Sequence, residues 1–165
     1  MNRLVEFFVD LLAWLALGFI AGAAMVTGTD VIMRHLLGAN IRGVTDLVEL
    51  AMMCAVFLSI AYAFARRGHV AVTVLTETMS DRTNTVLAFV WWLVAAVVMA
   101  TLAYATFDQA KMVISYGDSS QNLRIPMFWY WLPVVVGLAL SALASLYACM
   151  ITARDGANDI TEGRE

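Results

Sequence analysis

The sequence from Thr45 to Val74 reads TDLVELAMMCAVFLSIAYAFARRGHVAVTV, and its apolar middle decides the fold. The uncharged run from Leu50 to Ala65 has Glu49 at one end and Arg66 at the other. A helix of about 20 such residues crosses the roughly 30 Å hydrocarbon core of a bilayer. Charges stay at the ends of such runs because an ionised side chain at bilayer depth costs a few kcal/mol or more. We therefore predict a membrane-spanning helix here.

The composition of the whole chain supports the same interpretation. Of its 165 residues, 62% are hydrophobic and only 14% are charged, whereas soluble domains average about 45–50% and 25%. The basic residues are scattered and form no stripe suited to nucleic acid. Cys54 and Cys149 both lie inside apolar runs, so they indicate neither a disulfide framework nor a metal site. The sequence predicts an integral membrane protein.

Three further apolar runs complete the predicted architecture. We expect spans at about 8–33, 47–65, 85–112 and 126–153 in one membrane domain, residues 1–153, followed by a polar, disordered tail at 154–165. The first run is interpreted as an uncleaved span and not as a signal peptide, because Glu6 and Asp10 interrupt its approach. Its small residues Gly18, Gly22 and Gly28 either allow close helix contact or only reflect an alanine-rich span.

Four spans place both termini on one side of the membrane. The termini side then carries six basic residues and the opposite side four. They are Arg3, Arg66, Arg67, Arg82, Arg154 and Arg164 on the first side, and Arg34, Arg42, Lys111 and Arg124 on the second. The positive-inside rule favours a cytoplasmic termini side. The predicted fold class is an all-α integral membrane protein with four transmembrane helices and both termini cytoplasmic.

A first polar cluster surrounds the loop between the first two spans and contains Asp30, Arg34, Asp46 and Glu49. In one interpretation Arg34 pairs with Glu49 or Asp46 and ties the helical hairpin together. Asp30, four residues before Arg34, is also within pairing distance on a helix. In the other interpretation Arg34 or Glu49 points at a partner subunit.

A second cluster, Arg66, Arg67 and His69, follows the second span. These side chains either reach lipid phosphates and set the topology or form a docking surface for a neighbouring membrane protein. We expect a short interfacial or re-entrant segment and then a loop across residues 66–84.

A third polar stretch joins the last two spans. Residues 117–126 read GDSSQNLRIP and include Ser120, Leu123, Arg124 and Pro126. The stretch is either a plain connector or a surface for a soluble partner. The aromatic residues 128–131 that follow it are typical of an interfacial belt.

The sequence lacks the features of an enzyme or a solitary transporter. His35 and His69 fall at opposite membrane faces, so they cannot share a metal or ligate one haem, which disfavours a redox anchor. No pair of broken spans is present to hold a substrate at the midplane. An accessory subunit fits better. The alternative is an autonomous, homodimeric four-span exporter of the multidrug type, which requires a glutamate in the first span, and residues 11–29 contain none.

The same three stretches resemble the small membrane subunit of tripartite ATP-independent periplasmic (TRAP) transporters, over roughly residues 4–153. DVIMRHLLGANIRGVTDLVEL resembles the family's arginine and acidic residue around the first loop, here Arg34 and Glu49. ARRGHVAVTVL resembles its Arg-x-x-His segment, here Arg66 and His69. GDSSQNLRIPMFWYWLPV resembles its Ser-x-x-Leu-x-Ile-Pro loop, whose serine is Ser120 here.

The resemblance implies a function and a location. Such a subunit sits in the bacterial inner membrane beside a large multi-span subunit that imports a solute, often an organic acid, by a sodium-driven elevator mechanism. Sodium is expected in that large subunit, and no cofactor is expected in this chain. The small subunit is implied to be a fixed scaffold that also helps to dock a periplasmic binding protein, through residues 120–126 and the Arg34–Glu49 region.

Overall fold

The computed structural model describes residues 3–66 and 81–162, which contain four helices and no strand. The helices are α1 (Arg3–Leu37), α2 (Val44–Ala65), α4 (Asp81–Ser115) and α5 (Phe128–Glu162). Each includes a segment long and apolar enough to cross a membrane. The prediction of an all-α protein with four membrane-spanning helices is therefore confirmed.

Three of the helices extend beyond the spans that hydropathy indicates. α1, α4 and α5 contain 35 residues each, a length of about 52 Å at 1.5 Å per residue. The structure continues α5 to Glu162, so the expectation of a disordered tail from residue 154 is wrong. Adding residues to an existing helix avoids the cost of nucleation, and this favours helix in a polar segment that directly follows a span.

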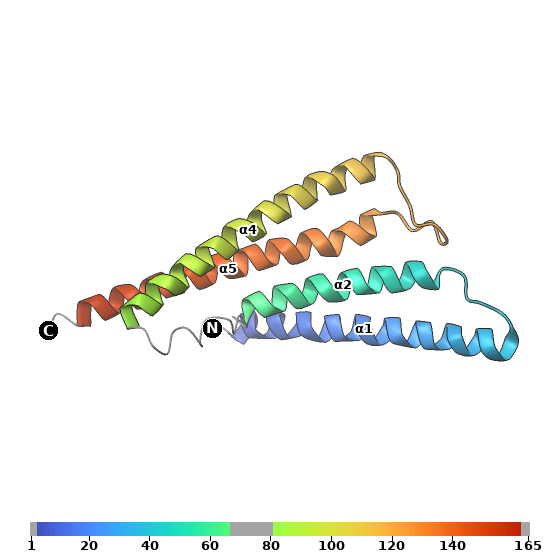
Figure 1. Ribbon diagram of the computed structural model, residues 1–165, viewed down its shortest axis with the longest axis horizontal. Helices are drawn as coiled ribbons and strands as arrows, with labels where there is room; N and C mark the ends of the chain where they lie inside the picture. Colours follow the sequence, from blue (N-terminus) through green and yellow to red (C-terminus); the bar gives the residue numbers. More distant parts are fainter. Residues whose placement is uncertain (1–2, 67–80, 163–165) are drawn as a thin grey trace.

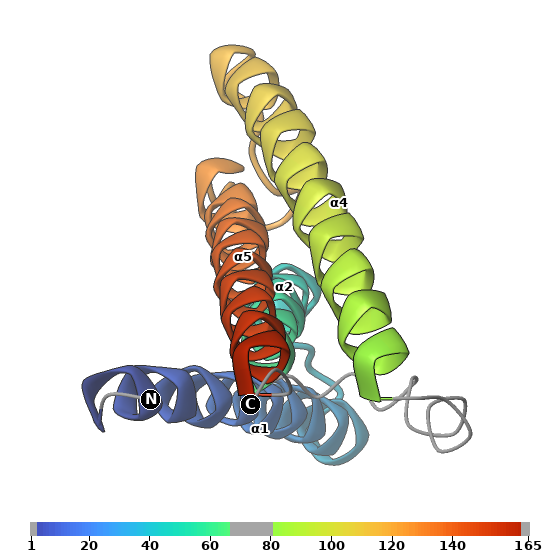
Figure 2. The ribbon, with the colours of Figure 1, turned by 90° about the vertical axis from the view of Figure 1, so that its left-hand side faces the viewer.

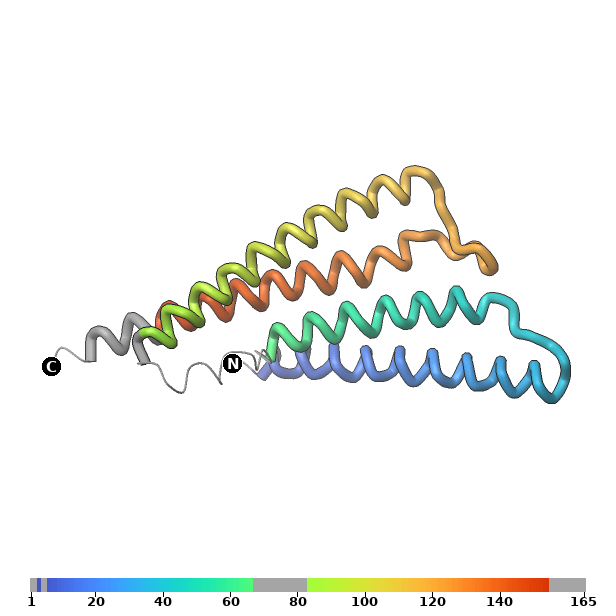
Figure 3. Tube along the Cα trace, viewed as in Figure 1, coloured from blue at the N-terminus to red at the C-terminus, as the bar shows by residue number. Residues whose placement is uncertain are grey.

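The chain forms two helical hairpins that pack through one helix of each (Figure 1). Residues 38–43 join α1 to α2, and residues 116–127 join α4 to α5. α2 and α5 lie side by side in the centre, with α1 packed on α2 and α4 packed on α5 (Figure 2). Both loops lie at one end of the molecule, and both ends of the chain lie at the other (Figure 3). We call the first of these the loop end.

The α2–α5 contact depends on small residues in α5. A Cβ atom added to Gly137 would lie 2.5 Å from the backbone oxygen of Phe57 on α2, so only glycine allows this approach. Ser141 and Ser145 follow at four-residue intervals and are 0% exposed. Their hydroxyls donate to the backbone oxygens of Gly137 and Ser141, at 2.7 and 2.8 Å, so both buried hydroxyls are paired within α5.

The small residues of the first span do not serve this purpose within the chain. A Cβ atom added at Gly18, Gly22 or Gly28 would meet nothing within 4 Å. Close packing of small residues therefore occurs between the two hairpins, on the last span. The outer faces of α1 and α4 instead expose large apolar side chains such as Trp14 and Val97, as expected of helices that meet lipid or other membrane subunits.

Candidate functional site

The loop end of the molecule is organised around the carboxylate of Asp46. This residue lies in the first turn of α2 and is 3% exposed. It accepts hydrogen bonds from the backbone N–H of Asn122 at 3.0 Å, the backbone N–H of Leu123 at 2.7 Å and the side-chain amide of Asn122 at 3.0 Å. One acidic side chain of the first hairpin thus holds the loop of the second.

A fourth hydrogen bond joins the same two hairpins, here between α5 and α2. The buried hydroxyl of Tyr130, in the first turn of α5, donates to the backbone oxygen of Asp46 at 2.8 Å. Tyr130 therefore belongs to the contact between hairpins and not to the predicted interfacial belt. Its neighbours Phe128 and Trp129 are exposed and remain consistent with a belt.

The 116–127 loop is also closed on itself. The backbone N–H of Ser120 donates to the oxygen of Ile125 at 2.9 Å, and the N–H of Ile125 donates to the Ser120 hydroxyl at 3.0 Å. The N–H of Met127 donates to the oxygen of Asp118 at 3.0 Å. Arg124 completes the turn with a left-handed φ of 54°. These bonds fix the loop in one compact shape.

The loop residues singled out from the sequence separate into two roles. Ser120 is 5% exposed, so its hydroxyl shapes the loop from inside and is not available to a partner. Arg124 and Pro126 are exposed, and Leu123 is 41% exposed. The surface that a soluble protein could contact is therefore formed by Arg124 and its exposed neighbours Asp118 and Gln121.

The two loops touch at Gly43. This residue caps the start of α2 with a left-handed φ of 79°. A Cβ atom added there would lie 2.2 Å from Cγ of Leu123. Leu123 thus packs on the backbone of Gly43, and its own N–H is fixed by Asp46.

We expect Gly43→Ala to loosen the contact between the loops. The left-handed backbone costs an alanine about 1–2 kcal/mol, and the overlap with Leu123 adds a similar amount. Gly38→Ala is the matched control, because Gly38 has a φ of 64° but nothing within 4 Å of an added Cβ. Thermal unfolding in detergent should show a larger loss at Gly43 than at Gly38, and equal losses would contradict the packing argument.

The predicted Arg34 pairing across the first loop is wrong. Arg34 pairs with Asp30, one turn earlier on α1. The buried carboxylate of Asp30 also accepts a hydrogen bond from the backbone N–H of Ile41 at 2.8 Å. Asp30 thereby fixes the path of the 38–43 loop, and its ion pair stays within one helix. The four residues of the first polar cluster do not form one network.

Glu49 lies apart from both Asp30 and Asp46. It is exposed on α2 and, within residues 3–66 and 81–162, it takes part in no ion pair. Asp46 is turned toward the second hairpin. The structure therefore assigns a separate position to each of the three acidic residues.

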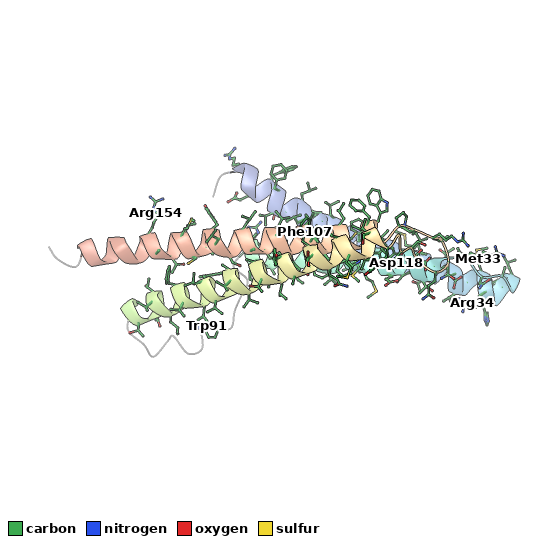
Figure 4. All side chains as sticks on the ribbon, turned by 90° about the horizontal axis from the view of Figure 1, so that it is seen from above. Met33, Arg34, Trp91, Phe107, Asp118 and Arg154 are labelled. Carbon is green, nitrogen blue, oxygen red and sulfur yellow. The ribbon has the colours of Figure 1, made fainter. Side chains whose placement is uncertain are left out.

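A polar hollow of about 320 Å³ lies where the two loops meet. Its lining includes Arg34 and Arg42 from the first hairpin and Asn122 from the second. Figure 4 shows Arg34 and Asp118 toward the loop end, with Arg154 toward the opposite end. Because Asp30 and Asp46 are buried, the accessible charges around this hollow are mainly the guanidinium groups of Arg34 and Arg42.

At the opposite end, Arg66 pairs with Asp10 of α1 and lies 5.9 Å from the ring centroid of Tyr62. The hydrogen bond that Arg66 donates to the Asp10 carboxylate raises the pKa of the Arg66 guanidinium. The motif arginine thus ties the end of α2 to the start of α1. Arg67, His69 and the segment expected to lie at the interface are outside the residues that the structure describes.

Sequence reasoning did not identify Asn122, Tyr130, Gly43 or Gly137. The sequence does show a glycine in the first loop and a tyrosine after Pro126. Neither feature indicates which residue of another helix it contacts. The contacts of Asp46 join residues 76 and 77 positions apart. Only the packing of the two hairpins brings them together.

The family model described as "Tripartite ATP-independent periplasmic transporters, DctQ component" matches residues 23–154. This range covers most of the chain, including all of α2 and α4 and both loops of the loop end. No curated protein matches the chain.

Proposed function

Because the chain belongs to the DctQ component family of tripartite ATP-independent periplasmic transporters, we propose that it is the fixed scaffold of such a transporter. In this function it stabilises a large membrane subunit that carries the solute and helps to seat the periplasmic binding protein. The family match gives no support to the alternative of an autonomous multidrug-type exporter.

The rigidity of the loop end is the observation that carries the docking proposal. Asp46 and Tyr130 fix the 116–127 loop to α2 through four hydrogen bonds. A loop held in one conformation loses little entropy when a partner binds it, which favours affinity. A plain connector between two spans needs no such constraint.

The charge of the loop end indicates which kind of surface would bind there. Arg34, Arg42 and Arg124 are exposed, while Asp30 and Asp46 are buried and only Asp118 of the acids in the two described loops is exposed. We propose that the binding protein presents an acidic face to these arginines, because opposite charges speed association and fix the orientation of two proteins.

The remaining features of the proposed function rest on the family resemblance and the charge count. The loop end faces the periplasm of a bacterial inner membrane, and the termini are cytoplasmic, in agreement with the excess of basic residues on the termini side. The solute is an organic acid, and its uptake is coupled to sodium bound in the large subunit. This chain serves as support and docking surface and not as an enzyme.

The proposal predicts that Arg124→Glu weakens docking of the binding protein. Reversing one exposed interfacial charge should raise the binding-protein concentration for half-maximal uptake about tenfold. Uptake is measured with the transporter reconstituted in liposomes. The control is Arg154→Glu, an exposed arginine at the opposite end. An effect of Arg154→Glu alone would contradict the proposed orientation, and no effect of either would contradict docking at this loop.

A further inference from the structure

A groove of about 560 Å³ follows one exposed face of α2 beside α1. Its walls are formed mainly by apolar side chains. Its lining residues are Thr27 of α1 and Val44, Thr45, Val48, Glu49, Met52, Met53, Val56 and Phe57 of α2. The side chain of Met52 is 57% exposed and that of Val56 is 50% exposed. The groove runs along the helix for nearly four turns, from Val44 to Phe57, and lies along a helix that is long and apolar enough to span a membrane.

Among the described residues, Glu49 is the one ionisable side chain that lines this groove. The three ion pairs of the described residues are Asp30–Arg34, Asp10–Arg66 and Asp108–Lys111, and Glu49 belongs to none of them. It stands in the second turn of α2, with Met52 and Met53 one turn further into the span. Glu49 lies at the end of the apolar run, where a carboxylate is tolerated, and it is exposed toward the open side of the groove, where a cation on a partner could pair with it.

We propose that this groove binds a transmembrane helix of the large subunit, and that a lysine or arginine of that helix pairs with Glu49. The inference rests on the proposed function, since it requires that the chain assembles with a large membrane subunit. The apolar length of the groove fits one face of a helix, and the flexible side chains of Met52 and Met53 adapt to its shape. Glu49 fixes how far along α2 the partner helix sits, because the carboxylate can pair with the partner's basic residue at only one position.

The charge of the groove argues against a second copy of this chain as the occupant. A symmetric dimer brings the same patch of both subunits together. The two Glu49 carboxylates would then lie in one apolar interface, and the groove lining contains no basic residue to separate them. Like charges in such a setting repel strongly. The chemistry of the groove therefore selects a cationic partner.

Photo-cross-linking tests the position of the partner. A benzophenone amino acid is placed at Met52 or Val56, with Leu143 on α5 as a control that is exposed but lies outside the groove. The full transporter is irradiated in its membrane. We expect Met52 and Val56 to cross-link to the large subunit, at least about tenfold more than Leu143. Cross-links from the groove to a second copy, or none in a complex that remains intact by co-purification, would overturn the proposal.

Charge substitution tests the role of the acid. Glu49→Gln should lower the amount of large subunit that co-purifies, and Glu49→Lys should lower it about tenfold. Asp108→Asn is the matched control, because Asp108 is an exposed carboxylate on α4 outside the groove. Replacing the basic residue mapped by cross-linking with glutamate should restore assembly of Glu49→Lys. Normal assembly of Glu49→Lys would reject the ion pair.

The same experiment separates this inference from the proposed function. If the groove variants retain the large subunit as well as wild type and Asp108→Asn do, the proposed role of the groove is wrong, and the accessory function still stands. If wild type retains no large subunit at all, the accessory function fails, and the groove assignment fails with it.

Discussion

Asp46→Ala is expected to detach the 116–127 loop from α2 and to abolish uptake that depends on the binding protein. The substitution removes the acceptor for two backbone N–H groups and one side-chain amide. A hydrogen bond to a charged group contributes about 1.5–3 kcal/mol, and the lower end applies here because Asn122 and Leu123 are exposed residues. We therefore expect a loss of about 3–5 kcal/mol in the free energy of unfolding.

Two measurements distinguish loss of the loop contact from general unfolding. Hydrogen exchange should accelerate at the amides of Asn122 and Leu123 while the centres of α2 and α5 stay protected. Asp46→Asn should give an intermediate result, because its amide oxygen can still accept the two backbone N–H groups that share one carboxylate oxygen, while its NH2 group cannot accept from the Asn122 side chain. Asp118→Ala is the control for the exchange measurement alone, since Asp118 is an exposed acid in the same loop. Wild-type exchange and uptake in Asp46→Ala would show that the loop is held by other contacts.

Gly137→Leu should separate the two hairpins. Even a single added carbon would lie 2.5 Å from the oxygen and 2.7 Å from the Cβ atom of Phe57. The first of these atoms belongs to the backbone and cannot turn aside, so α2 and α5 must move apart. Overpacking a core costs about 1–3 kcal/mol of stability when side chains can rearrange. Because Gly137→Leu forces a backbone shift, we expect it to lower the free energy of unfolding by more than this.

Gly22 offers the matched comparison on the first span. An added Cβ meets nothing within 4 Å there, so Gly22→Leu should leave the fold intact. Gly137→Ala should already lower thermal stability, whereas Gly22→Ala should leave it unchanged or raise it by up to about 1 kcal/mol, as expected for a helix without crowding. Circular dichroism melting and size-exclusion profiles in detergent provide the readout. Equal behaviour of the two sites would contradict the close α2–α5 contact.

The four helices were predictable because the bilayer imposes a simple rule on sequence. Backbone polar groups in hydrocarbon must be paired within the segment, so each long apolar run becomes a helix. The same rule does not predict where a helix ends once the chain has left the membrane and become polar. That is why the continuation of α5 to Glu162 was missed.

The polar residues predicted around the first loop make contacts in the structure, but not all of these contacts are the ones expected. Asp30, Arg34 and Asp46 were singled out as polar residues near a loop, but a one-dimensional pattern favours partners close in the sequence. Asp30 and Arg34, four residues apart, follow that expectation. Asp46 pairs with Asn122 and Leu123, which depends on how the hairpins pack. No periodicity in the sequence records that packing.

The two links between α2 and α5 have a mechanical consequence. One is the backbone contact at Gly137 and Phe57, and the other is the bonding of Asp46 to Tyr130 and the loop. Tyr130 and Gly137 lie seven residues apart on α5, about 10 Å along its axis. Two bodies joined at one point can turn in any direction, while two bodies joined at two separated points can turn only about the line through them. A sideways load across that line is therefore shared by both hairpins, which suits the proposed scaffold function.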